Sequence, residues 1–235
     1  LIGGNVASGR DFGLIMQNTE TELVFTHNTV SDFYWHGILL ENALGPSEIA
    51  WNDVTVFADA SASFTAHLAY ENAGEMNHVT ALQSVHDNTI DANGGSGIVF
   101  ISAISTSTYN ERTGGIFSNV QIADNTITNV GGKAIQLETD GDGGGFVDTL
   151  ISGNILSAQT GATSARGIRT LSTVTNTQVI SNQLSGFSQG FYQSYSWGEK
   201  GAVMPNGTEL RDNSFSGNTI AVQNQYTETL TLIDA

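Results

Sequence analysis

Apolar residues recur along this chain at fixed distances from a set of asparagines, and helical periodicity is missing throughout. An apolar residue stands three positions before each of these asparagines, and another stands two positions after it. All sixteen flanking positions are apolar in a chain that is 39% hydrophobic, so composition alone does not explain the pattern. The asparagines are Asn5, Asn28, Asn52, Asn88, Asn125, Asn154, Asn182 and Asn213.

A second strand-like segment follows most of the asparagines, and its first residue stands eight to thirteen positions after the asparagine. It consists of a small residue followed by apolar residues at every second position, which is the alternation of a β-strand. We place the less regular copies, in the repeats of Asn52 and Asn213, near residues 66–68 and 220–222. The clearest copy is 134–137, and others begin at Gly13, Gly37, Gly97, Gly167 and Gly190.

Short strands, no helix and a repeat of 23 to 37 residues predict a solenoid of parallel strands in which each repeat forms one coil. Loops of different length account for the variable spacing. Eight coils separated by about 4.8 Å would form a rod of roughly 35 to 40 Å. Because the repeat runs from end to end, residues 1–235 are expected to form a single all-β domain.

The repeat resembles that of the right-handed parallel β-helix in pectate-lyase-like proteins, mannuronan C5-epimerases and periplasmic carbohydrate-binding relatives, over nearly the whole chain. The resemblance implies a right-handed, single-stranded parallel β-helix of about eight coils. The Asp-Pro-His-Glu signature of the epimerases is absent, because Pro46 is followed by Ser47 and Pro205 by Asn206. The aspartate contexts of polygalacturonases are absent too. The resemblance therefore implies the fold and transfers no active-site residue.

The asparagines themselves favour a structural interpretation. A side-chain amide at a corner tolerates left-handed backbone geometry and bonds to its neighbours. Equivalent amides on successive coils can stack as a ladder. We therefore expect the asparagines to hold the coils together and leave them out of the candidate site.

Charge and composition narrow the possible partners. The formal net charge is −16, from seven basic and 23 acidic residues, which disfavours nucleic acid and anionic membranes. The chain has no cysteine for a disulfide or a thiolate metal site. No apolar run approaches the roughly 18 residues of a membrane helix, and the first residues do not form a signal peptide. These features suit a secreted bacterial protein, extracellular or at the cell surface.

Strand alternation places three of the seven basic residues on the outward face of two adjacent coils. They are Lys133, Arg166 and Arg169, and the same face is expected to carry Gln136 and Glu138. Cationic groups in this arrangement predict binding of the carboxylates or sulfates of an acidic polysaccharide. The alternative is a solvated face on which one of the arginines pairs with Glu138.

Connections of unequal length add a second indication of a site. The connection that follows the strand of Arg169 is short, whereas those of neighbouring coils are long. The long connections carry Tyr109, Arg112, Trp197 and Lys200. They predict walls around a floor that contains Arg169, with aromatic rings available to stack on sugars.

If the protein is an enzyme, a polysaccharide lyase or a uronate epimerase fits this face. Cations neutralise the uronate carboxylate, which acidifies the C5 proton, and a neighbouring base removes that proton. We assign the first role to Arg169 with Arg166 and Lys133, and the second to Tyr192 or a deprotonated Lys200. The alternative is a non-catalytic stalk or adhesion segment of a larger surface protein, which the missing catalytic signatures favour.

Two further kinds of site stay open. Asp140, Asp142 and Asp148 offer the oxygen ligands that calcium prefers, and no other cofactor is expected. Their spacing matches no established calcium loop, so a flexible glycine-rich turn is the alternative. The five histidines form no zinc motif, although His36 and His67 on the outward face would permit acid–base chemistry.

The ends of the chain also bear on its partners. The repeat starts at Ile2 and is still strand-like at 230–232. Because a solenoid needs polar caps, we expect a segment of a longer protein, or an assembly in which another domain or subunit covers the ends.

Overall fold

Residues 1–8, 11–57, 62–68, 78–103, 115–140, 144–171, 174–194, 206–225 and 230–233 are described by a computed structural model of the chain. Within these ranges all regular secondary structure is β-strand. The described part of the chain contains no helix long and apolar enough to cross a membrane. The expected all-β fold is confirmed.

The strands form three parallel sheets, one for each part of the repeat. Sheet A contains the strands before the asparagines: β1 (Ile2–Gly3), β4 (Leu23–Thr26), β7 (Ser47–Ala50), β11 (Gln83–His86), β15 (Val120–Ala123), β18 (Gly145–Ser152), β21 (Val174–Ile180) and β24 (Asn206–Arg211). It also contains β27 (Leu230–Ile233), which follows the last of these repeats, with β10 (His78–Val79) and β14 (Ile116–Ser118) beside the other strands. Sheet B contains the strands after the asparagines: β2 (Val6–Ser8), β5 (Thr29–Ser31), β8 (Asp53–Thr55), β12 (Thr89–Asp91), β16 (Thr126–Val130), β19 (Ile155–Ala158), β22 (Gln183–Ser185) and β25 (Ser214–Ser216). Sheet C contains the second strand of each repeat: β3 (Phe12–Thr19), β6 (His36–Ala43), β9 (Ala62–Leu68), β13 (Ile98–Ala103), β17 (Lys133–Asp140), β20 (Arg166–Leu171), β23 (Gln189–Gln193) and β26 (Ile220–Asn224).

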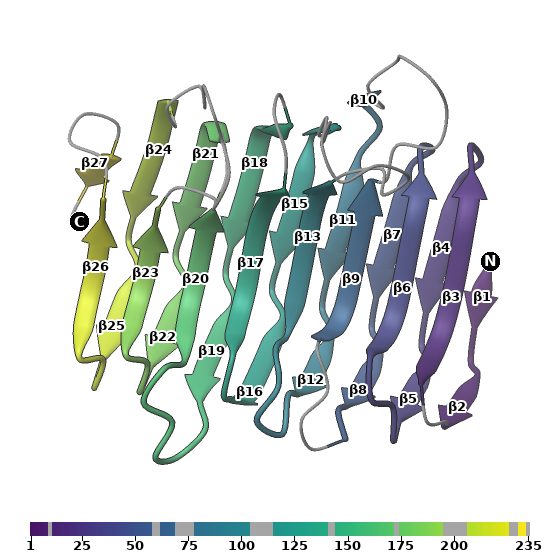
Figure 1. The fold of residues 1–235 in the computed structure, drawn as a ribbon, viewed down its shortest axis with the longest axis horizontal. Coiled ribbons are helices and arrows are strands. Elements are labelled where there is room, and N and C mark those ends of the chain that lie inside the picture. Colours follow the sequence, from purple (N-terminus) through teal and green to yellow (C-terminus); the bar gives the residue numbers. More distant parts are fainter. Residues whose placement is uncertain are drawn as a thin grey trace.

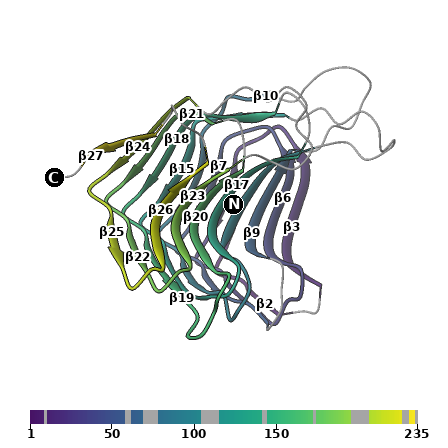
Figure 2. The same cartoon turned by 60° about the vertical axis from the view of Figure 1, so that its left-hand side comes forward.

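Each coil takes one strand from each sheet, and the strand order in every sheet follows the sequence. Figure 1 shows the strands of sheet C side by side from β3 to β26. Figure 2 shows the coils wrapping around a shared interior. The parallel β-helix predicted from the repeat is therefore confirmed, and the two less regular strands lie within β9 and β26 as expected.

The predicted alternation of inward and outward positions holds in sheet C. Ile135 pairs with Ile168, and Ile168 pairs with Phe191, and all three side chains are fully buried. The next residues along these strands, Gln136 and Arg169, are also paired with each other. Because successive side chains of a strand point to opposite faces, these two project outward.

The asparagines form the predicted ladder. The Nδ2 of Asn125 donates to Oδ1 of Asn154 at 3.0 Å, and the backbone N–H of Asn125 donates to the same oxygen at 3.0 Å. Nδ2 also donates to the carbonyl of Val85 in the preceding coil at 2.9 Å. Amide-to-amide bonds of the same kind join the asparagines from Asn5 to Asn213. Each rung satisfies buried polar groups that would otherwise destabilise the corner.

The left-handed geometry, however, lies one residue earlier than we expected. Positive φ values occur immediately before the ladder asparagines, at Gly4, His27, Trp51, Asp87, Asp124, Gly153, Ser181 and Asp212. The chain changes direction at this preceding residue, and the turn directs the following amide along the stack. The asparagine is then free to bond, and the residue before it carries the conformational cost.

A line of phenylalanines fills the middle of the interior. The ring centroids of Phe64 and Phe100 lie 5.6 Å apart, those of Phe100 and Phe117 5.5 Å, and those of Phe117 and Phe146 5.5 Å. All four rings are buried. Close-packed aromatic rings of this size stabilise a core strongly, so the outward residues of β13 and β17 project from a rigid sheet.

Candidate functional site

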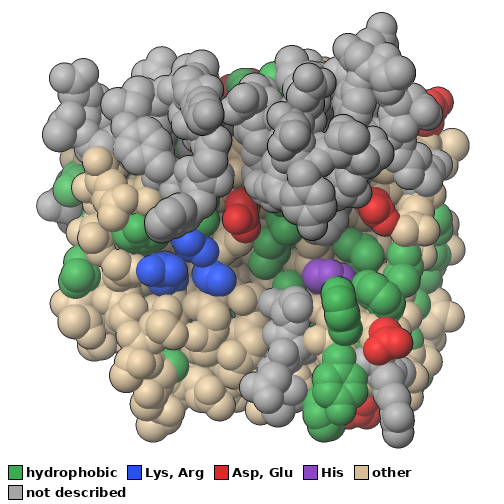
Figure 3. Space-filling view, viewed as in Figure 1, with side chains coloured by type: hydrophobic (Ala, Val, Ile, Leu, Met, Phe, Trp, Pro, Cys, Tyr) green, Lys and Arg blue, Asp and Glu red, His purple; other side chains and the backbone are tan. Residues whose placement is uncertain are grey.

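Three cations meet on the outward face of sheet C, on β17 and β20. Of the seven lysines and arginines, Arg10, Arg112 and Lys200 lie outside the described residues. Of the remaining four, Lys133, Arg166 and Arg169 form this group, which we name the basic cluster, and Lys133 pairs with Arg166 in the strand register. Figure 3 shows these side chains together on the face of the solenoid. The grouping predicted from strand alternation is therefore present.

Amide side chains hold the two arginines in place. Nη1 of Arg169 donates to Oε1 of Gln136 at 3.1 Å, and Nε2 of Gln136 donates to a carboxylate oxygen of Glu138. Nε of Arg166 donates to Oε1 of Gln189 on β23. The amide of Gln136 thus stands between Arg169 and Glu138, and the orientation of each guanidinium is fixed by a neutral neighbour.

Direct ion pairing of Arg166 or Arg169 with Glu138, which the sequence left open, does not occur among the described residues. The guanidinium carbon of Arg166 instead lies 4.7 Å from the centre of the Tyr192 ring. Such a cation–π contact orients the guanidinium without neutralising it. The positive charges of the cluster are therefore not cancelled by a contacting carboxylate from Glu138.

Burial and mutual repulsion make the cluster electrostatically costly. Burial lowers the pKa of Lys133, and the nearby charges of Arg169 and Arg166 lower it further, while Glu138 acts in the opposite direction. The pKa of Arg169 is lowered by burial and by Arg166, against the opposing effects of Glu138 and Tyr192. The Nε of Arg169 is buried and has no hydrogen-bond partner in the described part of the chain. An anion on this face would offset the repulsion between the cations and would raise the two lowered pKa values.

The remaining predicted residues are distributed as follows. Gln136, Glu138 and Tyr192 lie with the cluster, and Tyr192 is paired with Arg169 across β20 and β23 and is nearly buried. The predicted wall residues Tyr109, Arg112, Trp197 and Lys200 lie outside the described residues. Their proposed roles stay predictions.

The calcium prediction rests on three aspartates from one connection. Asp142 lies outside the described residues, and Asp140 ends β17 without a described side chain. Asp148 lies on β18 in left-handed geometry, and its Oδ1 accepts a hydrogen bond from Nδ2 of Asn176 at 2.6 Å. Among the described residues no three acidic, histidine or cysteine side chains are arranged to hold a metal ion. Calcium binding by the connection itself stays a prediction.

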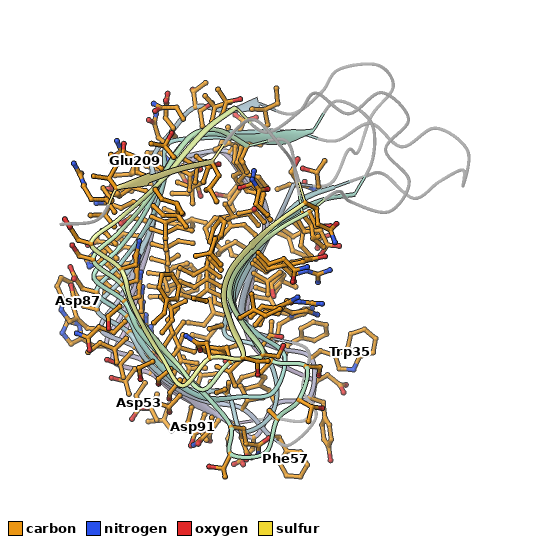
Figure 4. All side chains as sticks on the ribbon, turned by 90° about the vertical axis from the view of Figure 1, so that its left-hand side faces the viewer. Trp35, Asp53, Phe57, Asp87, Asp91 and Glu209 are labelled. Carbon is orange, nitrogen blue, oxygen red and sulfur yellow. The ribbon has the colours of Figure 1, made fainter. Side chains whose placement is uncertain are left out.

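An exposed group of aromatic rings on the N-terminal coils was missed in the sequence. Phe12, Tyr34, Trp35 and Phe57, which we name the aromatic patch, expose between 37% and 58% of their surface. The ring centroids of Phe12 and Trp35 lie 6.3 Å apart, and those of Tyr34 and Phe57 4.8 Å. Figure 4 shows Trp35 and Phe57 pointing away from the solenoid. The available signal was the Tyr34-Trp35-His36 run directly before Gly37, at the corner that enters β6.

A separate cavity lies on the outward face of sheet A. It has a volume of about 470 Å³, and its lining includes Glu48, His86, Asp87 and Gln121. Nδ1 of His86 lies 2.8 Å from a carboxylate oxygen of Asp87, and Nε2 lies 3.2 Å from one of Glu48. This cavity thus lies on a different sheet from the basic cluster.

Comparisons with known proteins identify the fold. No protein-family model matches the chain, and no curated protein sequence matches it. A solved structure of a T265N mutant of the periplasmic alginate epimerase AlgG superposes with a TM-score of 0.55 at 14% identity, covering 96% of this chain and 48% of that one. The Azotobacter vinelandii mannuronan C-5 epimerase AlgE4 A-module superposes with a TM-score of 0.52 at 15% identity, covering 99% of this chain and 58% of that one.

The chain is a right-handed parallel β-helix, as the resemblance of its repeat implied. It spans about half the length of the two epimerase structures it matches. At such low identity the likeness concerns the fold alone, because one solenoid carries many activities. The function has to be argued from the residues on the surface.

Proposed function

We propose that the basic cluster binds an acidic polysaccharide through the carboxylates of its uronate residues. The observation that carries the proposal is the gathering of three cations on one face of a chain with a net charge of −16. The pKa of Lys133 and of Arg169 is lowered there by burial and by neighbouring cations, so each positive charge disfavours the next. Such an arrangement is costly in the free protein and favourable when an anion is bound.

The geometry suits a carboxylate on a sugar ring. Guanidinium groups bind carboxylates with two parallel hydrogen bonds, and Lys133 adds a compact charge. Gln136 and Gln189 hold Arg169 and Arg166 in place before a ligand arrives. The same amides offer donors and acceptors to sugar hydroxyl groups. Pre-oriented arginines lose little conformational entropy on binding, which favours affinity.

Lyase or epimerase chemistry would require a base in addition to this binding site. Neutralising the uronate carboxylate acidifies the proton on C5, and a base that takes this proton leaves a stabilised carbanion. Elimination of the C4 substituent then completes a lyase reaction, and return of a proton to the opposite face completes an epimerisation. Tyr192 is the candidate base among the described residues, and its near-complete burial makes binding the better supported function.

Location and partners follow from the ligand. A polysaccharide of this kind lies outside the bacterial cytoplasm, so we place the protein in the extracellular space or at the cell surface. A further domain or subunit covering the ends of the solenoid would extend the same face. The structural stalk remains the alternative, and it predicts no affinity for any glycan.

Calorimetry with polymannuronate, polyguluronate, pectate and sulfated oligosaccharides tests the proposal, with a neutral glucan as reference. We expect Arg169→Ala to weaken uronate binding by about 1.5 to 3 kcal/mol, because a charged hydrogen bond is lost. The matched control is Arg211→Ala on β24, an arginine of sheet A whose Nε lies 3.5 Å from Glu209. Equal effects of the two variants would place binding elsewhere, and no binding of any glycan would favour the stalk. Absorbance of unsaturated uronates and proton exchange at C5 report any turnover.

A further inference from the structure

We propose that the cavity on sheet A binds a sugar that carries a protonated amine, separately from the acidic polysaccharide of the basic cluster. The inference does not rest on the proposed function, because the cavity lies on another sheet and its charged groups have the opposite sign. It assigns a second class of ligand to the molecule and names the residues that recognise the amine, the hydroxyl groups and the ring.

The cavity forms where small side chains interrupt the outward face of sheet A. Ser84 on β11 pairs with Glu48 on β7 and with Gln121 on β15, so these three form one row across the strands. One row further along, His86 pairs with Ala123. The small Ser84 and Ala123 line the cavity between the larger side chains, so its floor belongs to the strands themselves. A volume of about 470 Å³ is large enough for a ligand of about one or two sugar rings.

The charge of the cavity selects a cation. Its lining contains four carboxylates and no lysine or arginine. The side chains of Glu48 and Asp87 are 41% and 44% exposed, so a ligand reaches both. Because no three acidic or histidine side chains in the described part of the chain are arranged to hold a metal ion, we take the cation to be organic. A uronate would be repelled here, which separates this ligand from that of the basic cluster. The four carboxylates belong to Glu22, Glu48, Asp87 and Asp124.

His86 positions two of these carboxylates for an amine. Its Nδ1 lies 2.8 Å from a carboxylate oxygen of Asp87, and its Nε2 lies 3.2 Å from one of Glu48. A neutral imidazole donates through only one of its nitrogens, so the other nitrogen faces a carboxylate acceptor as an acceptor itself. An ammonium group has three donors and can bond to that nitrogen and to the neighbouring carboxylate at once. The arrangement therefore favours a protonated amine at this end of the cavity.

A buried hydroxyl on the floor of the cavity points to a ligand independently of the charges. Ser84 exposes only 6% of its surface, and its Oγ makes no hydrogen bond to any residue that the structure describes. A polar group held in this way costs free energy until it gains a partner. Gln121 stands beside it in the register and also lines the cavity. Together the hydroxyl and the amide offer donors and acceptors to the hydroxyl groups of a sugar.

An exposed tryptophan borders the cavity. Trp51 exposes 49% of its surface, and its ring centroid lies 5.2 Å from that of His86. The residue has a φ of 54°, which bulky side chains rarely adopt, and the equivalent corners of the next two coils carry Asp87 and Asp124. Neither the exposure nor the left-handed geometry favours the folded state. A tryptophan ring in this position suits stacking on a sugar or contact with an ammonium group.

Calorimetry with oligomers of glucosamine, N-acetylglucosamine and glucose, matched in length, tests the inference. At pH 6, where the amine of glucosamine is protonated, we expect the glucosamine oligomer to bind at least about tenfold more tightly than the other two, because acetylation removes the charge. Glu48→Gln and Asp87→Asn should each weaken its binding by about threefold to fivefold. Asparagine tolerates the left-handed geometry of Asp87, so the second change removes charge alone.

The matched control is Glu209→Gln on β24. Glu209 continues the row of Gln121 through Leu150 and Gln178, so it is an acid on the same face of sheet A outside the cavity. Its loss should leave glucosamine binding unchanged. An equal effect of Glu48→Gln and Glu209→Gln would reduce the binding to general attraction by an acidic protein and overturn the site.

The remaining outcomes separate this site from the basic cluster. Ser84→Leu fills the hollow and should abolish glucosamine binding, whereas Arg169→Ala should leave it unchanged. Should Ser84→Leu fold poorly, Ser84→Ala removes only the hydroxyl and should weaken binding by about threefold. Equal affinity for glucosamine and N-acetylglucosamine oligomers would overturn the role of the amine, and no binding of glucosamine oligomers by the wild-type protein would overturn the proposal. Neither result would affect oligouronate binding by the basic cluster, which is measured separately.

Discussion

The basic cluster on sheet C and the cavity on sheet A are both charged, but their charges are satisfied in different ways. In the cavity, His86 lies between Glu48 and Asp87, and each ring nitrogen approaches one carboxylate. In the cluster, like charges face one another, and the charge of Arg166 lowers the pKa of both Lys133 and Arg169. Figure 4 shows Asp87 on the opposite side of the solenoid from Trp35, which marks the face of the cluster.

The difference shows that a well-formed cavity is not necessarily the binding site of an acidic polysaccharide. A large concave site is the usual first candidate, and the cavity of about 470 Å³ meets that criterion. Its histidine already contacts carboxylates of the protein, and such exposed pairs contribute little free energy. The cluster instead concentrates like charge on partly buried groups, and a ligand of opposite charge would remove that repulsion. Repulsion between partly buried like charges is therefore the better guide to the site on this molecule.

Charge reversal on each surface should give the largest difference. We expect Arg169→Glu to weaken binding of an oligouronate by more than about 100-fold, because a like charge then opposes the carboxylate. Glu48→Lys makes the cavity less acidic and should leave the affinity within about twofold. Both affinities are measured by calorimetry at fixed ionic strength. Stronger binding by Glu48→Lys together with an unaffected Arg169→Glu would transfer the site to sheet A.

The fold itself was largely readable from the sequence, because each coil repeats the same constraints. Ile135 and Asn125 have equivalents in the other coils. A misleading residue in one coil therefore does not obscure the pattern, because the other coils repeat it. The location of the left-handed residue was not readable, since Asp124 and Asn125 both tolerate that geometry. Only the hydrogen bonds of the ladder decide which of them adopts it.

The site was readable only in part. Alternation along the strands placed Arg169 beside Gln136, but the choice between a direct ion pair with Glu138 and an intervening amide depends on rotamers, which a pattern does not specify. Trp35 was missed for a related reason. It lies at a corner, where the strand period no longer says which way a side chain points.

The pH dependence of binding should distinguish the two surfaces by a smaller, several-fold effect. Because burial and the arginines lower the pKa of Lys133, its charge is lost at a lower pH than in an ordinary lysine. A bound carboxylate favours the charged form, so affinity should be greatest below this pKa and should fall as the pH rises through it. Calorimetry from pH 7 to pH 10 measures the profile.

Lys133→Met should flatten that alkaline decline, because the titrating charge is gone. His86→Ala in the cavity should leave the profile unchanged. An alkaline decline of equal size in Lys133→Met would show that another group is responsible. Proton uptake on binding, measured in buffers of different ionisation enthalpy, gives a second readout of the same linkage.

Stability should give the smallest effect, with opposite signs on the two surfaces. The folded-state pKa of Lys133 lies below its unfolded value, so the charged lysine lowers the free energy of unfolding at pH values below both. This penalty shrinks as the pH rises between the two values and is absent above the unfolded one. Lys133→Met keeps the apolar stem and should therefore raise the free energy of unfolding near neutral pH, by no more than about 1 kcal/mol at this partly exposed position.

His86→Ala removes contacts to two carboxylates and should lower the free energy of unfolding by a similar amount. Urea denaturation at pH 7 and at alkaline pH measures both variants. A stabilising effect of Lys133→Met that persists unchanged at alkaline pH would show that packing is responsible, and the cluster would then be no more strained than the cavity.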